Sequence, residues 1–449
     1  MLPTLASLNA DLRAGRTSAV ELTSAALARA TDPAGEGARV FTLLQAERAM
    51  AQARASDTLR AAGIVRSPLE GLPVSVKDLF DVQGLPTTAG SVLLRDAPPA
   101  ERNATIVERL LAAGAVIVGR TNMTEFAYSG LGLNPHHGTP ANPWDRATRR
   151  IPGGSSCGAA VSVTDGMAVA AIGTDTGGSV RIPSALCGLT GFKPTARRVP
   201  QDGTLPLSTM LDSIGPLAAS VACCAVLDAI LAGEPLPALR TASLADLRLA
   251  VPGDVVLDDM DDEVARAFDA ACQRLSAAGA RIHRIALPEF RELPGLFARG
   301  TLPAAEAWAW HRSYIETRAD EYDPRVVSRM RLGEKMSAAD LLTLMAARTR
   351  WIAAVQARIA DADALLMPTV PQVAPAIAAL QHDDAAYTRA NGLMLRNPSF
   401  INFLDGCALS LPCHEPGNAP VGLMLAAPAG HDARLLSLGL AVEQALARS

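Results

Sequence analysis

Two segments of the chain share one arrangement, in which a helix passes through a glycine turn into a strand. Residues 104–122 read ATIVERLLAAGAVIVGRTN, and residues 261–288 read DDEVARAFDAACQRLSAAGARIHRIALP. In each, an AAGA turn leads into a run with β-branched residues, as in the αβ units of a wound sheet. We interpret the shared AAGA as recurrent turn chemistry and not as an internal repeat. The pattern predicts an α/β fold.

The chain is long enough for several domains, but the sequence favours one. At roughly 100–200 residues per domain, length alone allows about two to four domains or one large α/β domain. No low-complexity linker divides the 449 residues. Residues 290–400 form a less regular, mostly helical segment that is richer in Trp, Tyr and Arg. We therefore expect a single domain over residues 1–449, with 290–400 as a variable segment that lines the substrate cleft.

The charge and hydropathy patterns argue against nucleic-acid and membrane partners. The 41 basic and 45 acidic residues are interspersed and give a net charge of −4, without the basic stripe typical of nucleic-acid binding. The N-terminus has no basic region followed by an apolar core, so we expect no signal peptide. The longest apolar stretch, residues 214–227, contains a proline and is too short to cross a bilayer.

The seven cysteines indicate reduced thiols in a cytoplasmic protein. Their number is odd, and no C-x-x-C pair or Cys/His cluster has zinc spacing. The acidic run from Asp258 to Glu263 lies where a helix is expected to start. It lacks the glycine and the later glutamate of a calcium loop, so we interpret it as a complement to the helix dipole. The sequence predicts no metal site.

Two glycine–serine stretches are the strongest candidates for a functional site. They read IPGGSSCGAAVSV (151–163) and GTDTGGSVRIP (173–183). Neither has the lysine of a phosphate loop or the G-x-G-x-x-G pattern of a dinucleotide site. GSSCG matches G-x-S-x-G, which would make Ser156 a nucleophile, but no strand precedes it. From the glycines alone, both stretches are equally compatible with ordinary turns.

A further interpretation joins Ser179 to a lysine. Ser179 follows a short apolar run that is typical of a buried strand, and α/β sheets bind ligands at the carboxyl ends of their strands. The preceding glycines leave backbone N–H groups free to face an oxyanion. Lys77 ends the predicted strand within GLPVSVKDLFDV (71–82) and is the only lysine before Lys193. On the residues alone, Lys77 is also compatible with a surface position.

Taken together, these motifs resemble the amidase signature family. GGSSCG is followed by GTDTGGSVRIP, with Ser179 placed 24 positions after Ser155, and then by GLTGFKPT. GLPVSVKD, TNMTEFA and NPW upstream fit the same pattern, as do LDSIGPLA, LLMPTVPQVAP and NAPVGLML downstream. The resemblance covers the chain from about residue 65 to the C-terminus. It implies one domain with a mixed, twisted central sheet covered by helices.

The resemblance also implies roles for individual residues. Lys77, Ser155 and Ser179 correspond to the family's Ser–Ser–Lys triad, in which Ser179 is the nucleophile, Ser155 relays the proton after a cis peptide bond, and Lys77 is the base. The oxyanion hole corresponds to the backbone N–H groups of Thr176, Gly177, Gly178 and Ser179. The substrate-binding segment corresponds to Ala127, Tyr128 and Ser129, together with Ser155.

The proposed base must be neutral to accept a proton. A free lysine has a pKa of about 10.4, so neutralising it at pH 7 costs about 4.6 kcal/mol. Burial can lower a lysine pKa by roughly 3–5 units, which matches the requirement if the site is dry. We interpret Asp175 and Arg181, which flank the nucleophile, as supports of the turn. Cys157, where the family frequently has glycine, is interpreted as a packing residue.

The implied activity is hydrolysis of C–N bonds in amides through an acyl-enzyme, without a cofactor. We expect small, uncharged aryl or alkyl amides, with carbamates (urethanes) and esters as further substrates. The alternative is the amidase subunit of a tRNA-dependent amidotransferase, which would work with partner chains. A homodimer is compatible with the sequence. Four aromatic residues are expected to form either an aromatic cleft or helix core: Trp308, Trp310, Tyr314 and Trp351.

Overall fold

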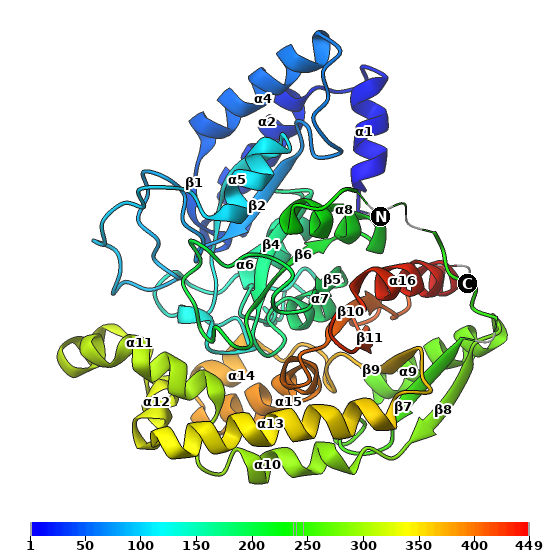
Figure 1. Cartoon of the computed structure of the whole chain (residues 1–449). Coiled ribbons are helices and arrows are strands. Elements are labelled where there is room, and N and C mark those ends of the chain that lie inside the picture. Colours follow the sequence, from blue (N-terminus) through cyan, green and yellow to red (C-terminus); the bar gives the residue numbers. More distant parts are fainter. Residues whose placement is uncertain (1, 237, 239, 246, 448–449) are drawn as a thin grey trace.

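One mixed sheet of 11 strands runs through the protein and is surrounded by helices (Figure 1). The computed structural model describes residues 2–236, 238, 240–245 and 247–447. The order of the strands in the sheet is β1-β3-β2-β4-β6-β5-β10-β11-β9-β7-β8. Their bounds are β1 Phe41–Leu44, β2 Pro73–Lys77, β3 Val116–Thr121, β4 Ala170–Asp175, β5 Thr190–Lys193, β6 Ser213–Ala218, β7 Arg248–Pro252, β8 Arg281–Ile285, β9 Ala364–Pro368, β10 Cys407–Pro412 and β11 Gly422–Ala427.

Helices precede, separate and follow these strands along the chain. The α-helices are α1 Leu5–Arg13, α2 Ala19–Thr31, α3 Gly37–Val40, α4 Ala46–Ala61, α5 Thr105–Ala112, α6 Cys157–Thr164, α7 Arg181–Cys187, α8 Val221–Ala232, α9 Asp262–Ala277, α10 Leu293–Leu296, α11 Leu302–Arg318, α12 Pro324–Met330, α13 Ala338–Arg358, α14 Ile377–Gln381, α15 Asp384–Phe403 and α16 Asp432–Ala447. The 3-10 helices are η1 Glu125–Ala127, η2 Pro288–Glu292, η3 Ala319–Glu321 and η4 Arg331–Lys335.

The mixed character of the sheet follows from its strand directions. β3, β2 and β4 are parallel neighbours, and so are β9, β7 and β8. Antiparallel pairs join the strands between these two groups, from β4 and β6 to β11 and β9. The fold is thus the single α/β domain with a mixed central sheet that the sequence predicts.

The helix–turn–strand units form as expected and lie in different parts of the sheet. α5 leads into β3 beside β2, whereas α9 leads into the edge strand β8. The acidic run starts α9, and Asp262 and Glu263 occupy its first turn. A capping box begins α2, where Ser18 Oγ accepts from the Glu21 N–H and the Glu21 carboxylate accepts from the Ser18 N–H.

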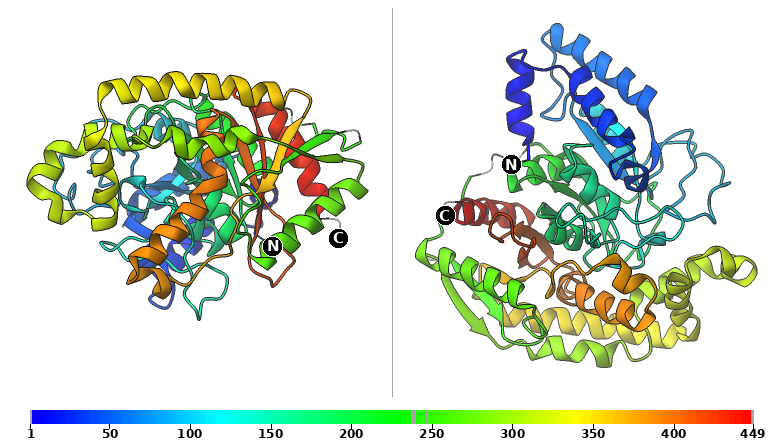
Figure 2. Two further views of the ribbon diagram at one scale, coloured as in Figure 1. Left: turned by 90° about the horizontal axis from the view of Figure 1, so that it is seen from below. Right: turned by 180° about the vertical axis from the view of Figure 1, so that it is seen from behind.

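The N-terminal helices and the segment 290–400 cover different ends of the sheet. α1, α2 and α4 lie at the end that contains β1, β2 and β3, whereas α10, α11, α12 and α13 lie at the opposite end (Figure 1). α13 extends along one edge of the molecule in the left view of Figure 2. α7 lies between these layers, and all of its residues are buried.

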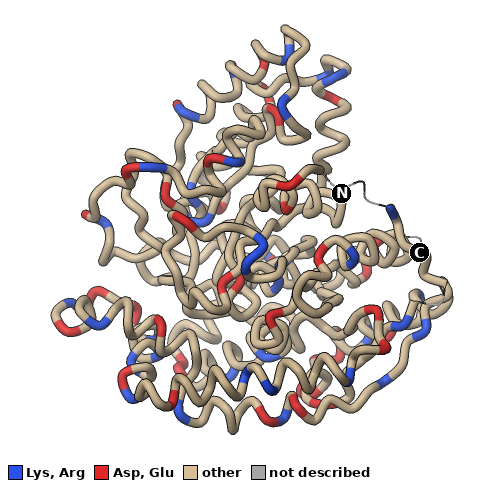
Figure 3. Tube along the Cα trace, in the orientation of Figure 1, with Lys and Arg blue, Asp and Glu red and all other residues tan. Residues whose placement is uncertain are grey.

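Lys and Arg positions are interspersed with Asp and Glu positions along the trace in Figure 3. None of the helices in the described part of the chain is long and apolar enough to cross a membrane. All seven cysteines are free thiols, as expected from their spacing.

Candidate active site

Lys77 is buried at the carboxyl end of β2, where it meets groups from two other segments. Its Nζ donates to Ser155 Oγ at 2.7 Å and to Thr174 Oγ1 at 2.8 Å. Thr174 lies on β4, the parallel neighbour of β2, so the sheet brings the two side chains to the same edge. The Lys77 side chain has no exposed surface, so it does not occupy the surface position that the residues alone also allowed.

Burial also lowers the pKa of this lysine. Loss of solvation lowers the pKa of Lys77 from 10.5 to about 7, although the charges of Asp212 and Asp175 act in the opposite direction. A substantial fraction of the amine is therefore neutral near pH 7. The shift has the size that a lysine base requires.

Ser155 lies in a glycine-rich loop immediately before α6. The Gly154–Ser155 peptide bond is cis, as the resemblance implies. A Cβ atom on Gly154 would lie 2.5 Å from the Gly132 nitrogen, so the loop packs too tightly for a larger residue. Ser155 itself is fully buried.

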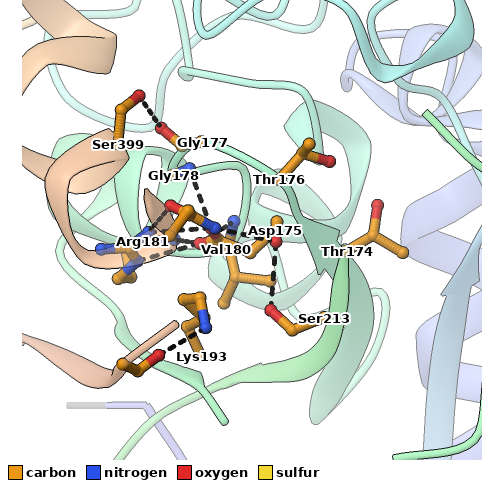
Figure 4. Close-up of polar contacts among 12 residues, drawn as sticks. Thr174, Asp175, Thr176, Gly177, Gly178, Val180, Arg181, Lys193, Ser213 and Ser399 are labelled. Carbon is orange, nitrogen blue, oxygen red and sulfur yellow. Dashed lines mark hydrogen bonds and ion pairs between the residues drawn. The ribbon is translucent and has the colours of Figure 1, made fainter. Parts of the chain in front are cut away.

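Ser179 lies in the turn that joins β4 to α7, and Asp175 organises this turn (Figure 4). The Asp175 carboxylate accepts hydrogen bonds from the N–H groups of Gly178 at 2.8 Å and Val180 at 3.2 Å. Arg181 Nε and Nη2 lie 3.0 and 2.8 Å from the same carboxylate. Burial opposes ionisation, but Arg181 outweighs it and holds the pKa of Asp175 well below its usual value. Asp175 and Arg181 are thus internal supports of the turn.

The predicted oxyanion hole divides into two kinds of N–H group. The Gly178 N–H donates to Asp175 and is therefore already satisfied. In the described part of the chain, no group accepts from the N–H groups of Thr176, Gly177 or Ser179. These three residues line a cavity, whereas Gly178 does not.

The loop that carries Ser155 and the turn that carries Ser179 are linked by a backbone hydrogen bond. The Ser156 N–H donates to the Ser179 carbonyl oxygen at 3.3 Å. Among the described residues, no hydrogen bond joins the Ser155 and Ser179 hydroxyls. Catalytic hydrogen bonds often shorten only when substrate binds, so this arrangement is compatible with a relay.

A cavity of about 230 Å³ opens beside Ser179. Ala127, Tyr128 and Ser129 contribute to its wall, whereas Ser155 does not reach it. The remaining lining residues come from the β4–α7 turn, from residues 207–211, and from two parts of the C-terminal half: Thr176, Gly177, Leu207, Leu211, Phe297, Thr301, Leu302, Pro303, Arg329, Leu332, Leu395, Ser399, Asn402 and Phe403.

The four aromatic residues singled out in the sequence do not line this cavity. Trp351 is buried in the core, where its Nε1 donates to the Glu289 carbonyl oxygen at 2.7 Å. Trp308, Trp310 and Tyr314 are half-buried and pack against the main core. The helix-core interpretation is therefore confirmed, and the aromatic-cleft interpretation is wrong. The physical reason is that these rings pack α11 and α13 against the hydrophobic core.

Cys157 and Ser156 are both buried beside Ser155. Burial raises the pKa of the Cys157 thiol to about 12, so it remains protonated and acts as a packing residue. Ser156 is also without exposed surface, and it precedes α6 without following a strand. The geometry of a nucleophile elbow is therefore absent around Ser156.

Three polar residues complete the site and were not singled out from the sequence. Thr174 accepts from Lys77, and Asp212 accepts from the Thr176 hydroxyl. Burial raises the pKa of Asp212 to about 6. Arg329 reaches the cavity from α12. Thr174 lies within the GTDTGGS motif and was detectable there, whereas Asp212 and Arg329 have no local sequence signal.

A mixed sheet surrounded by helices, with a buried lysine and two serine-bearing turns beside a small cavity, defines a class of enzymes that cleave C–N bonds of amides. The family model described as Amidase matches residues 21–436. The chain belongs to this family and is an amidase-family C–N hydrolase.

Relatives and solved structures match nearly the whole chain. The 2-amino-5-chloromuconic acid deaminase of Comamonas testosteroni is 41% identical over 401 residues, which cover 88% of this chain and 86% of that protein. A glutamyl-tRNA(Gln) amidotransferase subunit of Chloroflexus aggregans is 35% identical, with 98% and 96% covered. A crystal structure of an amidase superposes with a TM-score of 0.87 at 33% identity, with 99% of each chain covered.

Proposed function

We propose that the protein hydrolyses small amides through an acyl-enzyme on Ser179. The observation that carries this proposal is the contact of 2.7 Å between Ser155 Oγ and Lys77, a lysine whose pKa lies near 7. A neutral amine at this position can accept a proton that Ser155 relays from the Ser179 hydroxyl. The cavity beside Ser179 supplies space for the acyl group.

In the first half of the reaction, Ser179 Oγ forms a bond to the amide carbonyl carbon. Its proton passes to Ser155, whose own proton passes to Lys77. The N–H groups of Thr176, Gly177 and Ser179 stabilise the oxyanion, and Gly178 is not required because its N–H is held by Asp175. The C–N bond then breaks, and the leaving nitrogen takes a proton from the Ser155 hydroxyl, which is reprotonated by Lys77.

In the second half, water attacks the acyl-enzyme with Lys77 again as the base. The bond between Ser179 Oγ and the acyl carbon breaks, the carboxylic acid leaves, and the Ser179 hydroxyl is restored. No step requires a metal or a cofactor. Aryl and alkyl amides are the proposed substrates, and carbamates and esters are further candidates because the same attack on a carbonyl carbon applies to them.

The test compares two serine variants on a panel of anilide, aliphatic amide, carbamate and ester substrates. S179A is expected to abolish turnover while the circular dichroism spectrum and Tm remain close to those of the wild type. S156A is the matched control, because Ser156 is equally buried and was the alternative nucleophile. Full activity of S179A, or loss of turnover in S156A alone, would contradict the assignment.

A second candidate function is supported by the identity of 35% to an amidotransferase subunit over 98% of the chain. In that case the chain would release ammonia from glutamine only within a complex. Hydrolysis of a simple amide by the purified single chain supports the free hydrolase. Activity that depends on glutamine and on added partner subunits supports the amidotransferase function instead.

A further inference from the structure

Arg329 is the only charged residue among the described residues that line the cavity of Ser179. The remainder of the wall is apolar or carries neutral polar groups such as Ser129, Thr301 and Asn402. An ion that enters a small, largely apolar cavity loses much of its hydration, which is costly unless the ion is paired. A single cation in such a cavity therefore favours ligands that carry a negative charge.

The guanidinium of Arg329 has no anionic partner within the described part of the chain. Its Nη1 is buried without a hydrogen-bond acceptor, and no carboxylate forms an ion pair with it. Its neighbours differ: Arg325 on the same helix pairs with Asp384 at 2.7 Å, and Arg331 lies 4.0 Å from Glu334. A buried donor without a partner is costly, so Arg329 is held ready for an acceptor that enters from outside.

The surroundings fix the guanidinium in place. Its central carbon lies 4.7 Å from the centre of the Tyr128 ring, in the segment predicted to contact substrate. This cation–π contact orients the planar group without satisfying its N–H donors. The first turn of α11, represented in the wall by Leu302 and Pro303, adds a positive helix end to the same cavity.

We propose that Arg329 binds a carboxylate of the substrate, so that the preferred substrates are amides that carry a negative charge away from the scissile bond. This inference rests on the proposed function, and it replaces the expectation of uncharged substrates. The carboxylate accepts hydrogen bonds from the guanidinium fork, while the amide carbonyl at the other end of the molecule lies at Ser179. Arg329 is then a specificity-determining residue outside the proton relay.

The test uses monoamides of the linear dicarboxylic acids with three to six carbons, and the diamides of the same acids. A diamide replaces the carboxylate by a neutral group of nearly equal size. In initial-rate measurements with the wild-type chain, at least one monoamide is expected to exceed its diamide in kcat/KM by tenfold or more, after correction for the two reactive ends of the diamide.

R329M and R329K then report on the side chain itself. R329M is expected to lower kcat/KM for the preferred monoamide about 10- to 100-fold and to change that for the diamide less than about threefold. R329K keeps the positive charge but lacks the planar guanidinium fork. Its kcat/KM for the preferred monoamide is expected to lie between those of the wild type and R329M. R331M is the control, because it removes an equal charge from an exposed position close in the chain that does not line the cavity.

Failure of this inference is distinguishable from failure of the proposed function. Equal kcat/KM for every monoamide and its diamide, or an equal loss for both substrates in R329M and R329K, would overturn the role of Arg329 and leave Ser179 as the nucleophile. If S179A retained the wild-type rate on the same substrates, the proposed function itself would fall.

Discussion

Lys77 and Thr174 lie 97 positions apart in the chain, yet the Lys77 Nζ is 2.8 Å from the Thr174 hydroxyl oxygen. The parallel pairing of β2 with β4 produces this contact, since it aligns the ends of the two strands. Thr174 and Ser155 together accept two of the amine's hydrogen bonds without adding a charge. The hydrogen bonds of the Lys77 amine are therefore made to neutral hydroxyls, and burial has the largest effect on its pKa.

The value of kcat/KM for amide hydrolysis is expected to rise with pH, and the midpoint of this rising limb of the pH profile should lie near pH 7. Lys77 is active when neutral, and its pKa lies at about 7. Asp212 is the nearby carboxylate that most raises this pKa, so D212N is expected to move the limb to lower pH. The measurement is kcat/KM between pH 5 and 9 for both proteins. An unchanged limb in D212N, or a limb above pH 9 in the wild type, would contradict the assignment of Lys77 as the base.

The same pKa predicts how stability depends on pH. The folded-state pKa of Lys77 lies below its unfolded value, so between about pH 7 and 10.5 the unfolded chain binds more protons and stability rises with pH. Below about pH 7, Lys77 is charged in both the folded and the unfolded state, so its full destabilising effect on the folded protein is present and no longer changes with pH. The free energy of unfolding of the wild type relative to K77M should therefore increase by about 2–3 kcal/mol from pH 7 to pH 9. Urea unfolding of both proteins at the two values measures this difference, and a constant difference would show that Lys77 titrates normally.

The position of Lys77 could be predicted from the sequence, but its hydrogen-bond partners could not. A short apolar run with a lysine at its end indicates a strand terminus, and the motif then indicates a buried site. The contact with Thr174 depends on which strand lies beside β2, and this choice is made by the whole sheet. Arg329 shows the same limit: its sequence neighbours Arg325 and Arg331 look equivalent to it, and only the packing of α12 directs one of the three into the cavity.

Two local features of the site depend on side-chain directions that sequence patterns do not contain. The Gly178 N–H was expected to face an oxyanion, but the side chain of Asp175 folds back over the turn and accepts its hydrogen. Trp351 was compatible with a cleft, but its ring stacks on Phe290 with centroids 5.9 Å apart inside the core. In both cases the direction of a side chain decides the outcome, and tertiary packing sets that direction.

The ion pair of Asp175 and Arg181 is expected to be essential for folding and not only for activity. Neither side chain has exposed surface, and the carboxylate holds the N–H groups of the nucleophile turn. D175N leaves a buried guanidinium without its anion, which should lower the free energy of unfolding by about 3–5 kcal/mol. R181M should lower the free energy of unfolding by a similar amount. The double variant D175N/R181M should lower it by less than the sum of the two single effects. Chemical unfolding of the three variants tests this, and strict additivity would contradict a direct pairing.

The adjacent glycines of the nucleophile turn are expected to respond differently to substitution by alanine. Gly178 has φ +127°, a conformation that L residues rarely adopt, and a Cβ there would lie 2.6 Å from Pro398 Cβ and 2.7 Å from Ile182 Cδ1. G178A should therefore lower the Tm by several degrees and displace Ser179, with a loss of activity of at least about 100-fold. At Gly177 the backbone is ordinary, and a Cβ would lie 3.1 Å from the flexible Ser399 hydroxyl. G177A should fold with a near-wild-type Tm and lose activity only through crowding of the cavity. Equal Tm values for the two variants would mean that the turn relaxes freely and that its geometry is not fixed by packing.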